Sequence, residues 1–163
     1  MNKLLLSLIF LFPVFLFSQH SDRVLEIKQM YQEVKSYSED GKCNTISWEE
    51  TDEFRPFERE VSNCIYPDGY KRITLGFALW ESYLTSEYYF VNDKLFFVYE
   101  ITELGSEKLK TRVYFKENGD IEKILVDSGD GTLKVTDHKE LDRITNFNLR
   151  WLNIAEKELN KRK

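Results

Sequence analysis

The side chains best suited to nucleophilic, metal or acid–base chemistry in this sequence are two cysteines, two histidines and a large set of acidic residues. Cys43 and Cys64 are too far apart for a C-x-x-C redox pair, and no histidine is spaced to complete a zinc site with them. His20 lies near the start of the chain, and His138 is expected in the exposed first turn of a helix. No G-x-S-x-G, H-E-x-x-H or phosphate-binding glycine motif is present, so we predict no enzyme, no metal and no cofactor.

Two acidic segments could bind a cation. The residues from Glu49 to Glu60 form an acidic stretch around Pro56, but they lack EF-hand spacing, which favours a solvated connection over a binding loop. The segment Asp127–Gly131 is similar to the start of a calcium loop. It lacks the alternating acids and the final glutamate, so a turn is the better prediction.

The first eighteen residues have the layout of a signal peptide. Lys3 precedes an apolar run from Leu4 to Phe17 that, at about 14 residues, is too short for an ordinary transmembrane helix. The pattern resembles the signal peptides of exported Gram-negative bacterial proteins, and we expect cleavage after Ser18. The alternative is an uncleaved N-terminal anchor. Residues 19–163 then form a single domain in the periplasm or the secreted medium.

Export changes the expectation for the two cysteines. In an oxidising compartment, Cys43 and Cys64 are expected to pair as a structural disulfide. The closed loop of about 22 residues would stabilise the fold by roughly 3 kcal/mol in the chain-entropy description.

Composition excludes two broad classes of partner. The formal net charge is −5, and aromatic residues make up 15% of the chain. An acidic chain lacks the basic footprint of a general nucleic-acid binder and of a polybasic membrane-surface protein. The partner is therefore expected to be a protein or a small ligand.

The hydrophobic pattern predicts a helix, then strands, then a helix. Apolar residues recur at helical spacing in 21–38 and again after Thr136-Asp137. Between them, alternating segments separated by turn signals predict strands at 73–79, 87–91, 95–99, 111–116, 121–126 and 133–135, with a weaker strand at 45–48. We predict an α+β fold: an N-terminal helix, a curved antiparallel meander of about six to seven strands, and a C-terminal helix packed on the sheet. In outline this resembles cystatin-like or nuclear-transport-factor-2-like architecture, which implies no function.

Pairing the hairpins assigns side chains to the two faces of the sheet. We take tight turns at Asn92-Asp93, Gly105-Ser106 and Asn118-Gly119, and place directly paired residues on one face. The predicted core face, to be covered by a helix, carries Tyr89, Phe96, Val98, Thr111, Val113, Phe115, Ile124 and Val126. The opposite face carries Tyr88, Phe90, Leu95, Phe97, Tyr99, Arg112, Tyr114, Lys116 and Lys123. A slip of one residue in any hairpin would exchange its faces.

The aromatic and cationic face is the candidate binding surface, because tyrosine and arginine are enriched at binding hot spots. The sequence leads to the hypothesis of an exported, non-catalytic binding module that engages a protein or a small anionic or glycan ligand. Its proposed contacts are Tyr88, Phe97, Tyr99, Arg112, Tyr114 and Lys123. Packing under a helix or loop would explain the same residues without a ligand. A periplasmic inhibitor or immunity-type protein, or an enzyme with an unrecognised site, are the alternative functions.

Overall fold

The computed structural model describes residues 19–37, 41–51, 56–79 and 82–161. The predicted signal peptide at 1–18 lies outside these residues. In the described part of the chain, eight strands lie between two helices. The helices are α1 (Gln19–Ser36) and α2 (His138–Lys161). The strands are β1 (Lys42–Thr51), β2 (Pro56–Ile65), β3 (Tyr70–Leu79), β4 (Ser82–Val91), β5 (Lys94–Leu104), β6 (Glu107–Phe115), β7 (Ile121–Ser128) and β8 (Gly131–Lys134).

The eight strands form one antiparallel sheet in sequence order. The α+β meander with a C-terminal helix packed on it is therefore confirmed, with more strands than expected. The additional strand is β2, because residues 56–60 of the acidic stretch lie in a strand that pairs with β1, where a solvated connection was expected. Residues 52–55 of the stretch lie outside the described residues. Ile46 and Val61 pair and are buried, whereas Glu58 and Glu60 beside them are exposed. This alternation with a period of two is typical of a half-buried strand.

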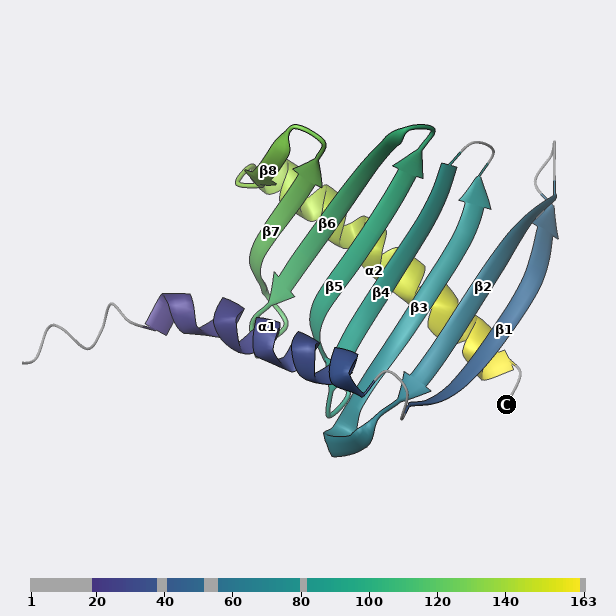
Figure 1. Cartoon of the computed structure of the whole chain (residues 1–163), viewed down its shortest axis with the longest axis horizontal. Coiled ribbons are helices and arrows are strands. Elements are labelled where there is room, and N and C mark those ends of the chain that lie inside the picture. The colour runs from purple at the N-terminus through teal and green to yellow at the C-terminus, as the bar shows by residue number, and fades with distance from the viewer. Residues whose placement is uncertain (1–18, 38–40, 52–55, 80–81, 162–163) are drawn as a thin grey trace, which may run out of the picture.

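The two helices lie on opposite faces of the sheet (Figure 1). An apolar stripe of α2, formed by Ile144, Leu152, Ala155 and Leu159, is buried against the sheet. The helix begins after Asp137, whose carboxylate accepts a hydrogen bond from the backbone N–H of Glu140 at 3.0 Å, as the sequence suggested. Helix α1 contributes fewer buried residues, with Ile27 and Val34 almost fully enclosed.

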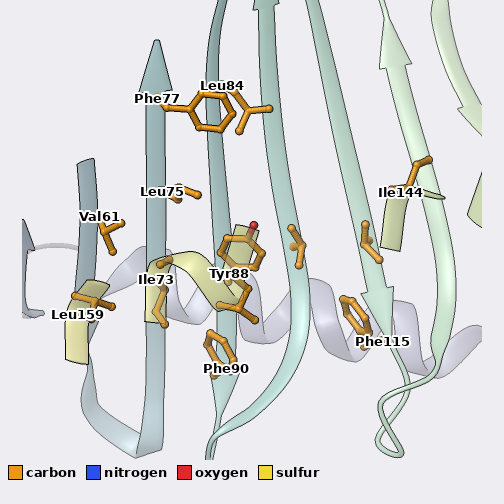
Figure 2. Close-up of a cluster of buried hydrophobic side chains, with 14 of the residues drawn as sticks. Val61, Ile73, Leu75, Phe77, Leu84, Tyr88, Phe90, Phe115, Ile144 and Leu159 are labelled. Atoms are coloured by element: carbon orange, nitrogen blue, oxygen red, sulfur yellow. The ribbon is translucent and has the colours of Figure 1, made fainter. Parts of the chain in front are cut away.

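Each face has its own cluster of buried side chains. The cluster under α2 is mainly aliphatic (Figure 2). Its strand members include Val61, Ile73, Leu75, Phe77, Leu84, Tyr88, Phe90, Val98, Val113, Phe115 and Ile124. The cluster under α1 is mainly aromatic and includes Tyr66, Tyr70, Tyr89, Phe96, Phe97 and Tyr114. Both faces of the sheet are therefore used for packing.

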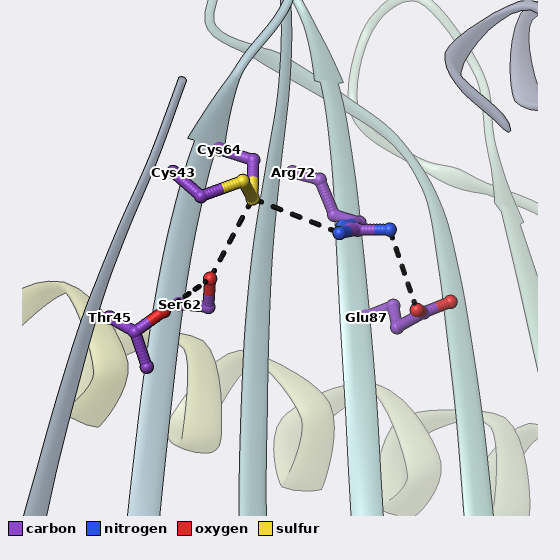
Figure 3. Close-up of a disulfide and its surroundings, with 6 residues drawn as sticks. All are labelled: Cys43, Thr45, Ser62, Cys64, Arg72 and Glu87. Carbon is purple, nitrogen blue, oxygen red and sulfur yellow. Dashed lines mark hydrogen bonds and ion pairs between the residues drawn. A yellow bond between two sulfur atoms is a disulfide. The ribbon is translucent and has the colours of Figure 1, made fainter. Parts of the chain in front are cut away.

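The predicted disulfide is confirmed. Cys43 and Cys64 lie directly opposite each other on β1 and β2 and are bonded (Figure 3). Arg72 of β3 points a guanidinium nitrogen at the sulfur of Cys64, 3.7 Å away, and Ser62 lies 3.6 Å from the same sulfur. The bond therefore cross-links the two strands of the first hairpin, and Cys64 is buried in the α1-side cluster.

Two irregularities in the sheet correct the predicted faces. Between Tyr89 and Phe90 the pairing with β5 shifts by one residue, so Tyr89 faces Phe97 and not Phe96. The extra residue places Phe96 and Phe97 in the same α1-side cluster. We predicted that Tyr89 and Phe96 share a sheet face with Val98. That prediction is wrong, because Val98 lies beneath α2 and the two aromatic residues lie on the α1 side.

The other half of the predicted core face is correct. Val98 pairs with Val113, and Val113 pairs with Ile124, all buried beneath α2. The shift between Tyr114 and Phe115 replaces the expected two-residue turn at Asn118-Gly119 with a longer loop. The turn at Asn92-Asp93 is tight as predicted, with φ values of 50° and 61° that suit asparagine and aspartate.

Candidate functional site

Five of the six predicted contact residues lie on the sheet face covered by α1, and four of them line one cleft there. Phe97 pairs with Tyr114, and Tyr99 pairs with Arg112, on the neighbouring strands β5 and β6. Directly paired residues in a sheet point to the same side, so these four form one continuous patch. Phe97 and Tyr114 are only 4% and 2% exposed, whereas Tyr99 and Arg112 remain half-buried. One part of the patch is therefore packed and buried, and the other part is accessible to solvent.

The structure places Tyr88 on the other face of the sheet and Lys123 on the same face but outside the cleft. Tyr88 is fully buried on the opposite face, where its hydroxyl donates a hydrogen bond to the backbone oxygen of Asn148 at 3.0 Å. Its placement on the aromatic-cationic face is wrong because the register shift at Tyr89 was not foreseen. Lys123 does share a face with Tyr114, its direct partner on β6, but it does not line the cleft described next.

A cleft of about 380 Å³ lies between α1 and the patch. Its helix wall includes Lys28 and Tyr31, and its sheet wall includes Tyr99, Lys110 and Arg112. This volume is within the range of sites that hold small molecules.

The inner end of the cleft is built from aromatic rings in contact. Tyr31 of α1 meets Tyr89 and Phe97 edge to face, with both ring centroids 5.2 Å away. Phe97 in turn lies 5.1 Å from Tyr114. Such contacts fix the rings and leave an apolar surface that a planar ligand group could cover.

Tyrosine hydroxyls at this end of the cleft stay protonated at neutral pH. Burial, and next the carboxylate of Glu87, raise the pKa of Tyr31. Burial also raises the pKa of Tyr114, although the guanidinium of Arg112 opposes the shift. Both hydroxyls are therefore neutral groups able to donate and accept hydrogen bonds.

The outer part of the cleft carries the charges. Arg112 forms an ion pair with Asp127 at 2.5 Å, and the side chains of both are 28% exposed. Thr132 also donates a hydrogen bond to Asp127. The Nε of Arg112 is buried and has no acceptor among the described residues.

The cations outnumber the acids around this cleft. Lys28, Lys110 and Arg112 line it, and Asp127 is the one carboxylate among its described lining residues. A guanidinium and two ammonium groups beside an apolar ring surface favour a ligand that combines an anionic group with a ring.

A polar contact region holds α1 in place at the far end of the aromatic cluster. Lys35 of α1 lies 3.5 Å from the carboxylate of Glu87, and Tyr89 donates to the same carboxylate at 2.7 Å. Tyr70 of β3 donates to Glu33 of α1 at 2.8 Å. These contacts fix the helix that forms one wall of the cleft.

The sequence hypothesis missed the contribution of α1. Tyr31 lies within the segment 21–38, where apolar residues recur at helical spacing, but periodicity does not say which sheet face a helix covers. The pair formed by Lys110 and Asp127 follows directly from the pairing of Thr111 with Val126, which was predicted. The pairing of Lys110 with Asp127 could therefore have been predicted from the sequence, and it adds one pair of residues to the patch.

The structure also places the histidine and the acidic segments that the sequence singled out. Within the described ranges, no group of three or more His, Cys, Asp and Glu side chains is arranged to hold a metal ion. His138 is exposed at the start of α2, away from the cleft. Residues 127–131 form the end of β7 and its turn into β8, as predicted.

Comparisons with protein-family models, with curated proteins and with solved structures found no match to this chain. Neither helix in the described part of the chain combines the length and the apolar character needed to cross a membrane.

Proposed function

We propose that the protein is an exported, non-catalytic binding module whose α1-side cleft takes a small ligand with a ring and an anionic group. The observation that carries this proposal is the cleft itself. It joins a packed aromatic surface, which includes Tyr31 and Phe97, to three cations on a chain with a net charge of −5. The local charge is therefore opposite in sign to that of the whole chain, which favours anionic ligands.

A small ligand suits this geometry better than a protein partner does. Helix α1 already packs on much of the aromatic face, and Phe97 and Tyr114 are almost fully enclosed. Protein partners require a broad accessible patch, of about 800 Å² on each side in a standard interface. The cations and the rings remain accessible to a small molecule through the cleft of about 380 Å³.

The disulfide supports the exported location. The bond between Cys43 and Cys64 is the kind of feature that persists in oxidising compartments and is rare in the cytosol.

The proposal is tested with two probes of similar shape. Calorimetric titration with naphthoate and with neutral naphthylmethanol compares a ring that bears a carboxylate with one that does not. We expect naphthoate to bind about tenfold more tightly, since a charge-assisted hydrogen bond to arginine contributes on the order of 1.5 kcal/mol or more.

Two variants test whether the preference for the acid over the alcohol arises in the cleft. Arg112→Gln removes the guanidinium and should abolish the preference for the acid. Lys123→Gln removes one positive charge from the same sheet face outside the cleft, and should leave the preference unchanged. Equal binding of the acid and the alcohol by the unmodified protein, or equal losses in the two variants, would refute the proposal.

A further inference from the structure

A second groove, of about 510 Å³, lies on the α2 side of the sheet, between the C-terminal half of α2 and the first two strands. Figure 1 shows this part of α2 behind the β1 end of the sheet. Trp48 of β1 and Arg59 of β2 are direct partners and form the sheet wall. Trp151 of α2 faces them, with its ring 5.2 Å from the guanidinium of Arg59.

The groove is lined with positive charge. Arg59, Arg150, Lys157 and Lys161 line it, and among its described lining residues Glu158 is the one carboxylate. Glu158 is already paired with Lys161 at 2.5 Å. Within the described part of the chain, neither Arg150 nor Lys157 has an ion-pair partner. On a chain of net charge −5, this region is a local concentration of cations.

The helical cations are arranged in a row. Arg150, Lys157 and Lys161 are seven and four residues apart, so they fall on one side of α2 and span about 16 Å along its axis. A single phosphate or sulfate ion reaches one or two of them. A chain that carries anionic groups at intervals can reach all of them, and each contact adds to the affinity.

The helix dipole accounts for only part of this arrangement. Lysines in the last turn of a helix are favoured by the dipole without any ligand, which covers Lys161. The effect falls off within one turn, so it does not explain Arg150, and it has no bearing on Arg59 in the sheet. Arg59 stacks on Trp151 of α2, and together with Arg150, Lys157 and Lys161 it places four cations on one groove.

We propose that this groove binds a linear polyanion, a chain that carries sulfate, phosphate or carboxylate groups at successive positions. Arg59 and Arg150 supply planar guanidinium groups for oxyanions, and Lys157 and Lys161 extend the contact along the helix. The half-buried rings of Trp48 and Trp151 form the apolar part of the walls. The site is independent of the α1-side cleft, because the two lie on opposite faces of the sheet.

The test uses tryptophan fluorescence, because two of the three tryptophans of the chain line the groove. The probes are a heparin hexasaccharide, tripolyphosphate and inorganic phosphate. We expect the hexasaccharide or tripolyphosphate to bind at least about tenfold more tightly than inorganic phosphate, with an affinity that falls steeply as salt is added. Equal affinity for both polyanions supports recognition of the oxyanions alone, and tighter binding of the hexasaccharide supports an added contribution from sugar rings against the indoles.

A pair of double variants on the same helix provides the control. R150Q/K157Q removes two cations from the groove, and K139Q/R143Q removes two from the other end of α2, with the same change in net charge. We expect the first to weaken polyanion binding about tenfold and the second to change it less than twofold. The proposal is wrong if the unmodified protein binds the polyanions no better than inorganic phosphate, or if both double variants lose affinity equally.

Discussion

The two faces of the sheet are formed by the same strands but are packed with different kinds of side chain. Beneath α2, aliphatic side chains such as Leu75, Val98 and Val113 are enclosed to 1% exposure or less. Beneath α1, the buried side chains are mainly tyrosine and phenylalanine, and several keep a polar partner, as Tyr89 does with Glu87. A cleft with an ion pair at its edge remains on this second face.

This difference indicates how the chain divides folding from binding. Close-packed aliphatic surface contributes most of the stability that burial can provide, and it leaves no room for a ligand within the buried cluster itself. The polyanion groove proposed above lies at the edge of that cluster, between α2 and the first two strands. Aromatic rings with polar tips keep hydrogen-bond donors available where a packed surface meets solvent. The α2 face is therefore expected to govern unfolding, and the α1 face to govern recognition of a small ligand.

The largest expected effect is a loss of stability on truncating a side chain, which should be greater beneath α2 than beneath α1. Leu75→Ala opens a cavity beneath α2 and should lower the free energy of unfolding by about 2–5 kcal/mol. Leu125→Ala, at a half-buried position of the α1-side cluster, should cost roughly half as much or less, because less apolar surface is lost. Urea unfolding followed by circular dichroism measures both, and equal losses would contradict the division.

The disulfide gives the next largest effect. Reduction with dithiothreitol should lower the free energy of unfolding by about 3 kcal/mol, since the cysteines are 21 residues apart in the sequence. The double variant Cys43→Ser with Cys64→Ser should match the reduced protein and should not respond to reductant. Unfolding of all three forms in urea makes this comparison, and an unaffected reduced protein would show that the first hairpin holds without the bond.

The buried carboxyl of Glu100 tests how completely water is excluded from the α2 face. Glu100 is 8% exposed and accepts a hydrogen bond from Ser86 at 3.2 Å. Burial raises the pKa of this carboxyl, so the folded state holds its proton more tightly than the unfolded chain does. The protein should therefore lose stability as the pH rises above the ordinary value near 4.5.

Glu100→Gln should remove that dependence. The variant is expected to be more stable than the wild type at neutral pH, with a gap that closes as the pH falls toward 4.5. Thermal unfolding across this pH range measures the gap. Glu103→Gln, at an exposed ion pair with Lys108, serves as the control and should show no such trend.

The smallest effect concerns the contacts that hold α1. Burial, and next the hydrogen bond to Glu33, raise the pKa of Tyr70 to about 12. Tyr70→Phe should cost about 1 kcal/mol of stability and remove one late-titrating phenol from an ultraviolet pH titration. Tyr83→Phe, at an exposed tyrosine, should leave the stability unchanged. If both substitutions have the same effect, the polar contacts of α1 do not stabilise its position.

Local patterns predicted most of the architecture. The two amphipathic stripes, the tight turns at Asn92-Asp93 and Gly105-Ser106, and the Val98–Val113–Ile124 row followed from periodicity and turn chemistry. The disulfide followed from the expectation of export. The acidic residues around Pro56 concealed β2, because charge on the exposed face of a strand resembles a solvated loop in sequence.

The candidate site was predicted only in part, for a physical reason. Phe97, Tyr99, Arg112 and Tyr114 were grouped correctly because the β5–β6 turn is regular. Tyr88 was misplaced because a bulge depends on packing against both helices, which no turn signal records. The helix wall of the cleft was missed because an apolar stripe does not indicate which sheet face it will cover.

The proposed division between the faces is tested most directly by mapping where an anionic ring ligand binds. Backbone amide chemical shifts, recorded by nuclear magnetic resonance during a titration with naphthoate, report every affected site at once. The expected result is a set of saturable shifts at Lys28, Tyr31, Tyr99 and Arg112, with the α2 face unchanged. Shifts centred on α2 and its groove, or none that saturate, would contradict the assignment of ligand binding to the α1-side cleft.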